Sequence, residues 1–478
     1  MIKVKSEADK VCVAKAQEAG QGHLFERWDE LSQEDQRGLL RDLRSINFQL
    51  VKRLLHQRRQ GQDSGLELDM LAPAQVDGPA DANGTQLEKA CPNAEAALSE
   101  GKIALFLLAG GIGLGSPTEP TGMLPVGPIS GKSLFQLHAE KIRALNRRYK
   151  TSLPLHILIH PDHLDATSDF FKAENHFGLN PSDVHFVPQP LLPLIDRRGR
   201  FLRTEPGKLA LSPNGHGGVL DGYLNPEGVE ELRKNGIEQL FFFQADNPMV
   251  RVGDPAFLEH HLNGDYEVSS KYIERLDNEE DLGVFCRIGD TTGVIRYTTL
   301  PEQERNSRGT DGRPGFAVGD MAAHIFKLDF ISRIHEESLQ LPFHTSEKTV
   351  SFINRQGELE RATEMTGQGP LPSGGYVDIG SFKDIAKRAD SDIQLDDMSR
   401  RTVKLIAVAA TNQAAHIVAA VREFDLVPED NSISVRPRSL EAKQLRSRRS
   451  RKQVRKALEM LQNRSGSGPE IAAELQNL

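Results

Sequence analysis

The sequence predicts an α/β fold built on a doubly wound, mostly parallel sheet. The run Ile103–Ala109 has the length of a strand and is apolar on both faces, which is typical of a parallel sheet covered by helices on both sides. A glycine-rich turn follows this run at residues 110–115. Strand and helix patterns then alternate along the chain, and this alternation favours parallel strands joined by crossover helices.

The elements of this alternation begin at Lys102. Strands are expected at Ile103–Ala109, Leu155–Ile159, Val184–Val187 and Gln239–Gln244. Helices are expected at Ser133–Tyr149, Leu164–Glu174 and Gly228–Asn235. The next part of the chain has shorter strand patterns of antiparallel type, at Glu267–Ile273, Leu282–Ile288 and Gly293–Thr298. The predicted sheet is therefore mixed.

Four parts of the chain differ in composition and pattern. Residues 1–60 read as a segment of amphipathic helices, and residues 61–98 as a linker, because Gly61–Asn93 is rich in Ala, Gly, Pro and Asp. The α/β domain is expected at residues 99–389. Residues 390–478 are expected to form a helical, basic C-terminal module, with a helix at Arg400–Phe424.

The composition is that of a soluble globular protein. The length of 478 residues is enough for two or three domains. The residues are 38% hydrophobic and 26% charged. No run of 18 apolar residues is present, so no transmembrane helix and no membrane partner are expected, and the N-terminus does not have the pattern of a secretory signal. Cys12, Cys91 and Cys286 lack CxxC spacing, so reduced thiols and a cytoplasmic location are expected, without a zinc site. The oligomeric state is not revealed.

A dense basic run lies near the C-terminal end. Between Arg436 and Lys456 the chain has ten basic residues and one acid, Glu441, although its net charge is −8. Such a run is typical either of a solvated helix or tail or of a segment that binds a polyanion. A partial apolar stripe from Leu440 to Leu461 favours the helix, and no aromatic side chain is interleaved to stack on bases. A nucleic-acid partner is therefore not expected.

The glycine-rich turn is the first candidate for a binding site. Gly110, Gly111 and Gly113 let the backbone turn sharply and present its N–H groups to a ligand. The carboxyl end of a first strand is where α/β sheets bind nucleotides. A plain tight connection has the same composition, and the spacing matches neither the Walker loop nor the dinucleotide fingerprint. The turn alone leaves the ligand open.

Two more segments have a pattern typical of a site. Asp246 comes directly after the strand Gln239–Gln244 and suits either a metal ligand or an ordinary turn. In the loop Asn214–Gly218, glycines at 215, 217 and 218 allow close approach of a flat base, and His216 lies among them. A loop histidine is equally often a solvent-exposed residue.

Five segments carry a resemblance to a known family. They are Gly20–Phe48, Leu107–Ile142 (with LLAGGIGLGSP), Phe170–Asp196, Ser212–Leu220 (SPNGHGGVL) and Phe241–Pro255 (with FFFQADNP). In this order they resemble the eukaryotic-type UDP-N-acetylglucosamine pyrophosphorylases and related UDP-sugar pyrophosphorylases, which are uridylyltransferases. The resemblance implies a Rossmann-like nucleotidyltransferase domain of GT-A type. It also implies the reaction of UTP with a sugar 1-phosphate, such as an N-acetylhexosamine 1-phosphate, to give a UDP-sugar and pyrophosphate.

The resemblance also assigns roles to residues. It implies Mg²⁺ held by Asp246, a nucleotide bound at the glycine loop, and a sugar pocket lined by Gly283. Nucleotide contacts are expected from Gly110, Gly111, Gly113, Gln189, Gly215, His216 and Gly217. Lys132 matches a family position. It is a candidate phosphate partner, or a residue that merely caps or flanks the start of the helix at Ser133. Arg296 stands where the family has a sugar-reading glutamate, and Ala317 stands where it has a sugar-reading asparagine. Arg296 is a candidate replacement cation for the reaction or a partner of Asp320, and both residues are expected in the sugar pocket.

Three cations of the family pattern are absent. The loop arginine is missing at Gly113-Leu114-Gly115, the lysine of Pro-Lys-Gly is Thr121, and a later lysine is Tyr376. Phosphoryl chemistry depends on cations that neutralise the leaving group. Two interpretations therefore stay open: a uridylyltransferase with rearranged cations, or a catalytically impaired relative that binds a nucleotide or nucleotide-sugar and regulates a partner.

Overall fold

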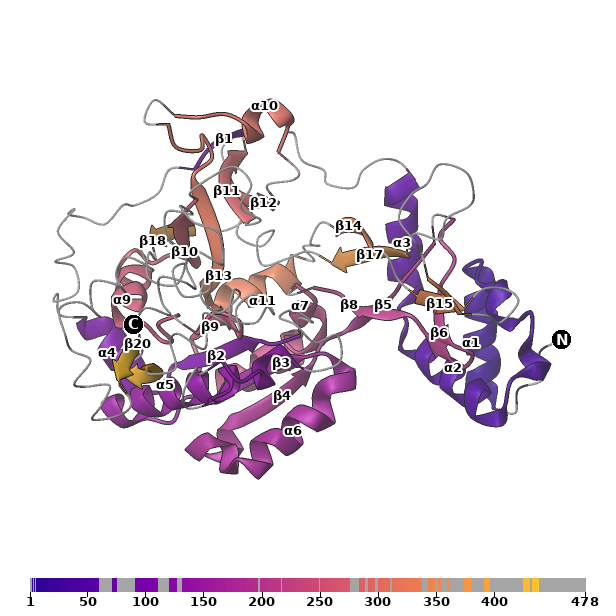
Figure 1. Ribbon diagram of the computed structural model, residues 1–478, viewed down its shortest axis with the longest axis horizontal. Coiled ribbons are helices and arrows are strands. Elements are labelled where there is room, and N and C mark those ends of the chain that lie inside the picture. Colours follow the sequence, from indigo (N-terminus) through magenta and orange to yellow (C-terminus); the bar gives the residue numbers. More distant parts are fainter. Residues whose placement is uncertain are drawn as a thin grey trace, which may run out of the picture. The chain divides into compact units, whose positions relative to one another are not determined.

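The apolar run that begins at Ile103 is a buried strand in the computed structural model of this chain (Figure 1). β2 (Ile103–Leu108) is buried along its whole length and pairs in parallel with β3 (Leu155–Ile159) and β9 (Gln239–Gln244). β4 (Val184–Pro188) pairs in parallel with β3, so the order β9-β2-β3-β4 forms the parallel part of the sheet. The prediction of a parallel sheet is confirmed.

The structure describes most of the first 337 residues and a few later strands. The described residues are 2, 4, 6–59, 71–74, 91–110, 120–126, 131–196, 198–215, 217–248, 250–275, 283–288, 291–296, 300–309, 312–337, 343–348, 351–353, 359–361, 374–379, 391–395, 424–429 and 432–437. Among them, no helix is long and apolar enough to cross a membrane.

These residues fall into two compact units. The sheet unit comprises residues 67–188, 223–339 and 385–478, and the helical unit comprises residues 1–66, 189–222 and 340–384. The predicted N-terminal helical segment is thus part of a unit that also includes residues 189–222, which the sequence placed in the α/β domain.

The strands predicted to be antiparallel, in residues 267–298, do pair antiparallel in the main sheet. β13 (Val318–Lys327) pairs antiparallel with β9, and β11 (Gly283–Ile288) pairs antiparallel with β13. β12 (Thr291–Arg296) forms a hairpin with β11, and β10 (Val268–Glu274) lies antiparallel to β13.

Helices cover one face of the parallel strands, and their apolar residues share a core with that face (Figure 1). The helices are α4 (Pro92–Ser99), α5 (Leu134–Tyr149), α6 (Leu164–Ala173) and α9 (Pro255–Asn263). α5 begins where expected, because the Ser133 hydroxyl accepts a hydrogen bond from the Gln136 N–H at 3.1 Å and caps the helix.

The opposite face of the parallel strands carries a row of stacked rings. Phe106 stacks on Phe242 and on His156, in each case with ring centroids 4.6 Å apart, and Tyr223 contacts Phe106 and His156. α8 (Pro226–Lys234) and α11 (Leu328–Glu336) pack against each other, and α11 also packs against β13. The strands are therefore buried on both faces, as the apolar run predicts.

The helical unit has its own core. α1 (Glu7–Glu18), α2 (Gln33–Ser45) and α3 (Phe48–Arg59) pack with apolar residues from the segment 192–209. The remaining elements of this unit are α7 (Gly218–Gly222), β5 (Leu191–Pro193), β6 (Arg203–Glu205), β7 (Lys208–Leu209), β8 (Leu211–Pro213), β14 (Phe343–Lys348), β15 (Ser351–Ile353), β16 (Leu359–Arg361) and β17 (Gly374–Ile379).

The predicted linker at residues 61–98 contains two regular elements. α4 begins at Pro92 and buries Ala94, Ala97 and Leu98, and this helical spacing was hidden by the polar composition around it. β1 (Leu71–Pro73) pairs antiparallel with β11 at the edge of the sheet, where a strand tolerates proline.

The described part of residues 390–478 consists of three strands. β18 (Ser391–Leu395) pairs in parallel with β10, and β19 (Phe424–Glu429) pairs antiparallel with β20 (Ser432–Pro437). Ile393 and Leu395 alternate with polar residues, which is the period of a strand. The predicted helix Arg400–Phe424 lies outside the described residues except for Phe424, and so does the basic run beyond the end of β20.

Candidate active site

The carboxyl edge of the parallel strands brings two predicted site residues together. Gly110 follows β2 and Asp246 follows β9, and the two strands are neighbours with Leu108 opposite Gln244. The Ala245 N–H donates to the Leu108 carbonyl at 3.0 Å, so this pairing continues to the residue before Asp246. Gly111 and Gly113 lie outside the described residues. The rule that α/β sheets bind ligands at this edge makes it the candidate active site.

Asp246 has the surroundings of a ligand-binding carboxylate. Its side chain is half-buried, and burial raises the pKa of its carboxyl group. Within the described part of the chain, no lysine or arginine forms an ion pair with it. Asn247 beside it is buried. A carboxylate that is desolvated without a cation is suited to a ligand that brings positive charge.

Lys132 already has an anionic partner. Its ammonium lies 2.9 Å from Glu140 Oε2, and Gln136 Nε2 donates to Glu140 Oε1 at 3.0 Å. Both charged side chains are about one-fifth exposed, at 22% and 21%. A phosphate at Lys132 would have to share its ammonium with Glu140 or displace that carboxylate.

The segment Pro120-Thr121-Gly122 begins a short 3₁₀ helix, Thr121–Met123, and Thr121 is buried. Gly122 packs closely against the ring of Phe135: a Cβ added at this position would lie 2.2 Å from Phe135 Cζ. Close packing against α5 therefore explains the glycine, and the neutral hydroxyl of Thr121 supplies no charge where the family pattern has lysine.

Gly122→Ala is expected to lower the free energy of unfolding by about 1–3 kcal/mol, because the added methyl overpacks the Phe135 ring. Urea unfolding of the purified variant measures this. Gly22→Ala is the control: no described atom lies within 4 Å of a Cβ at this position, and its backbone does not have a left-handed φ, so its stability should be nearly unchanged. An unchanged stability in Gly122→Ala would contradict the packing.

The three sugar-side residues are neighbours in the antiparallel part of the sheet. Gly283 on β11 lies opposite Arg296 on β12 and opposite Asp320 on β13. The structure therefore brings together residues that are 13 and 37 positions apart from Gly283 in the sequence. The side chain of Arg296 lies outside the described parts.

Asp320 belongs to a polar group that includes a histidine not predicted from the sequence. Its Oδ1 accepts from the Ala322 N–H at 2.8 Å and lies 3.7 Å from His324 Nε2. His324 Nδ1 is 2.8 Å from the Ser270 hydroxyl, and all three side chains are buried. Ala322 has a left-handed φ of +55° at an irregularity in the pairing of β10 with β13. The only signal in the sequence was a histidine within an apolar strand.

The predicted base-binding residues belong to the helical unit. Gln189 and Asn214 are buried, at 5% and 3% exposed, and Gln189 Oε1 and Asn214 Oδ1 have no hydrogen-bond partner among the described residues. The Asn214 N–H donates to the Pro190 carbonyl at 3.0 Å, which places these two segments side by side. Gly215 has φ +81°, and Gly218 packs against the Asn214 side chain. Gly217 is buried, and His216 lies outside the described residues.

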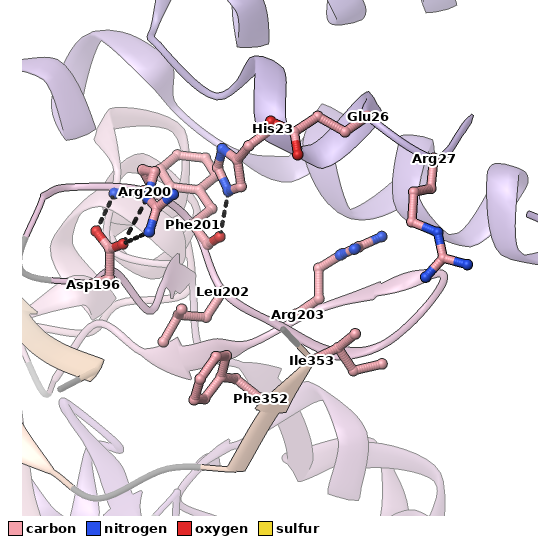
Figure 2. A pocket seen from close by; sticks show the side chains of 10 residues that line it. All are labelled: His23, Glu26, Arg27, Asp196, Arg200, Phe201, Leu202, Arg203, Phe352 and Ile353. Atoms are coloured by element: carbon pink, nitrogen blue, oxygen red, sulfur yellow. Dashed lines mark hydrogen bonds and ion pairs between the residues drawn. The ribbon is translucent and has the colours of Figure 1, made fainter. Parts of the chain in front are cut away.

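A pocket in the helical unit contains none of the predicted site residues (Figure 2). Asp196 lies in its wall and is held by its own turn: it accepts from Arg200 Nε at 2.7 Å and from the N–H groups of Arg198 and Arg200. His23 contacts the Phe201 carbonyl through Nε2 at 2.9 Å, and burial lowers its pKa. These contacts fix a turn, and they give no sign of a nucleotide site.

Comparisons with known proteins agree with the geometry. Residues 47–366 match the family described as UTP–glucose-1-phosphate uridylyltransferase. UDP-N-acetylglucosamine diphosphorylase 2 of Arabidopsis thaliana is 30% identical over 369 residues, which are 72% of each chain. UDP-N-acetylglucosamine pyrophosphorylase of Saccharomyces cerevisiae is 28% identical over 73% of this chain and 77% of its own.

A solved structure shows the same fold over nearly the whole chain. The uridine diphosphate N-acetylglucosamine pyrophosphorylase of Trypanosoma brucei, in complex with an inhibitor, matches with a TM-score of 0.69 and 19% identity, and the match covers 99% of this chain and 97% of that one. The match of residues 47–366, together with the carboxyl-edge position of Gly110 and Asp246, shows that this chain belongs to the UTP–glucose-1-phosphate uridylyltransferase family.

Proposed function

We propose that this protein is a UDP-sugar pyrophosphorylase that transfers the uridylyl group of UTP to an N-acetylhexosamine 1-phosphate. The observation that carries the proposal is the half-buried Asp246 beside Gly110 at the carboxyl edge of a family-type sheet. Relatives named for UDP-N-acetylglucosamine support the choice of sugar. The location is proposed to be cytoplasmic, and the free thiols of Cys12, Cys91 and Cys286 support it.

The reaction requires alignment of two polyanions more than it requires a covalent intermediate. A phosphate oxygen of the sugar 1-phosphate attacks the α-phosphorus of UTP, the α–β phosphoanhydride bond breaks, and pyrophosphate leaves with the electron pair. The backbone at Gly110 is open to close approach of phosphates, as is proposed for Gly111 and Gly113. Gly283, Arg296 and Asp320 are proposed to contact the sugar.

Asp246 fits a divalent metal that is bound together with the nucleotide. Among the described residues, no group of three or more His, Cys, Asp or Glu side chains could hold a metal by itself. Mg²⁺ is commonly bound by one or two carboxylates together with substrate phosphates and water, so a single desolvated carboxylate is sufficient. When bound, the ion would neutralise charge on the phosphates.

Gln189, Gly215, His216 and Gly217 are proposed to contact the nucleotide base, and Asn214 is added to them. The unpartnered oxygens of Gln189 and Asn214 are acceptors suited to N–H donors of a ligand. The glycines permit the backbone to approach a flat ring.

The test is pyrophosphate release from UTP with a panel of sugar 1-phosphates, with and without Mg²⁺, together with calorimetric titration of UTP. Turnover that requires both Mg²⁺ and an N-acetylhexosamine 1-phosphate is expected. Turnover with a different sugar 1-phosphate alone would show that the proposed sugar substrate is wrong. UTP binding without any turnover would overturn the proposed enzymatic activity and favour a catalytically impaired relative that regulates a partner.

Lys132→Met is expected to raise the KM for UTP about tenfold, because the variant loses a charged contact with the phosphates. A tenfold change corresponds to about 1.4 kcal/mol of binding free energy. Steady-state kinetics at saturating sugar phosphate measure it. Glu140→Gln is the control, since it removes the competing carboxylate and leaves the ammonium in place. A KM unchanged in Lys132→Met would limit Lys132 to its ion pair with Glu140.

A further inference from the structure

The loop that carries Asp246 is held by side chains of α5. This loop runs from Ala245, directly after β9, to Val250. Three of its carbonyl oxygens, those of Ala245, Pro248 and Val250, contact polar side chains of the helix. These side chains are His138 and Lys141, which lie three positions apart and therefore on the same face of α5.

Lys141 is a fully buried cation whose ammonium is bound by the loop. Its side chain is 0% exposed, and its Nζ donates to the carbonyls of Pro248 and, at 2.8 Å, of Val250. A buried ammonium is costly unless its N–H groups are hydrogen-bonded, so both contacts matter to the folded state. Together they fix the loop on both sides of residue 249.

His138 fixes the beginning of the same loop. It is also 0% exposed, and its Nε2 lies 2.9 Å from the Ala245 carbonyl, one residue before Asp246. Burial is the main reason that its pKa is lowered to about 3, and Lys141 adds to the effect, so the ring is neutral near pH 7. The neutral ring then donates its Nε2–H to the carbonyl.

The polarity of these two positions calls for an explanation beyond packing. Leu137, Ile142 and Leu145 are apolar and buried on the same helix, as a core helix requires. A methionine or phenylalanine would fill the positions of Lys141 and His138 without burying a charge or a polar ring. The two polar side chains occur where α5 meets the loop that carries Asp246.

We propose that His138 and Lys141 are positioning residues, which hold the backbone on either side of Asp246 so that its carboxylate is fixed at the carboxyl edge of the sheet. The role for catalysis rests on the proposed function, whereas the fixing of the loop does not. Groups that orient a metal-binding carboxylate typically change metal affinity or activity by 10- to 100-fold when they are removed.

Hydrogen–deuterium exchange of the peptide that covers residues 245–253 tests the fixing of the loop directly. Lys141→Met removes the ammonium and keeps a long apolar side chain, and it is expected to speed amide exchange in this peptide about tenfold or more. His138→Phe keeps a ring and loses the donor, and it serves if Lys141→Met does not fold. Phe171→Leu on α6 is the control for general destabilisation, because Phe171 is buried but contacts other rings instead of the loop.

Two further measurements distinguish a positioning role from a general effect on stability. Mn²⁺ binding in the presence of UTP, followed by electron paramagnetic resonance, is expected to weaken about 10-fold or more in Lys141→Met, and kcat to fall 10- to 100-fold with little change in the KM for the sugar phosphate. Lys141→Arg, which keeps the charge, is expected to recover part of both. Phe171→Leu is expected to change neither.

Loop exchange no faster than in Phe171→Leu would overturn the proposal, and so would faster exchange with unchanged Mn²⁺ affinity and kcat. If the wild-type protein neither binds Mn²⁺ with UTP nor turns over, the proposed function fails. The exchange experiment then still decides whether His138 and Lys141 fix the loop.

Discussion

Asp246→Asn is expected to lower kcat for pyrophosphate release by about 10²- to 10³-fold, because the amide keeps the shape of the side chain and removes the charge that would hold a metal ion beside the phosphates. The variant should fold, since no ion pair of Asp246 is lost among the described residues. The rate is measured at saturating UTP and sugar 1-phosphate, and over a range of Mg²⁺ concentrations.

The matched control is Asp265→Asn in the same unit. Asp265 is an exposed carboxylate that pairs with Lys327, and nothing places it near the candidate site. It should keep the wild-type rate. A rate in Asp246→Asn within threefold of wild type, with unchanged dependence on Mg²⁺, would show that the Asp246 carboxylate takes no part in the reaction.

The parallel half of the sheet could be predicted from local sequence. Strands that are buried on both faces are mostly apolar, and Leu155–Ile159 and Gln239–Gln244 have the same bounds in the structure as in the prediction. β1 could not be predicted, because three residues are too few to show a period. Its pairing with β11 is a contact between segments about 200 residues apart, and nothing in the local sequence indicates it.

Part of the candidate site was predictable for a similar reason. Gly110 and Asp246 each follow a recognisable strand, and the carboxyl ends of parallel neighbours meet at one edge. The contacts of His138 and Lys141 were not predictable, because helical spacing places both positions on the apolar face of α5 but does not identify the backbone carbonyls that they bind. Only the packing of α5 against the loop shows these partners.

Lys271→Met is expected to lower the free energy of unfolding by about 3–5 kcal/mol at pH 7, because it leaves the Asp254 carboxylate buried without its main partner. Lys271 Nζ lies 2.5 Å from Asp254 Oδ2, and both side chains are 6% exposed. Arg251 is farther away, at 3.9 Å, and compensates only in part. Urea unfolding measures the change. Lys327→Met is the control, since its partner Asp265 is exposed and its loss should leave stability almost unchanged.

The pH dependence of this difference identifies the carboxylate as its cause. Burial by itself would raise the pKa of Asp254, but the charges of Lys271 and Arg251 outweigh burial and hold that pKa below its ordinary value. In the wild type, the ion pair therefore contributes its full stabilisation between about pH 4, the ordinary pKa of aspartate, and pH 7, and this stabilisation is lost as the pH falls through the lowered pKa of Asp254. In Lys271→Met, the effect of burial on the Asp254 pKa is opposed by Arg251 and by the Ala256 N–H but no longer by the ammonium of Lys271. Asp254 therefore takes up a proton at a higher pH, and the cost of burying its unpaired charge shrinks as the pH falls. The stability gap between the two proteins should thus narrow from pH 7 towards pH 4, and a gap independent of pH would mean that lost packing, not the unpaired carboxylate, destabilises the variant.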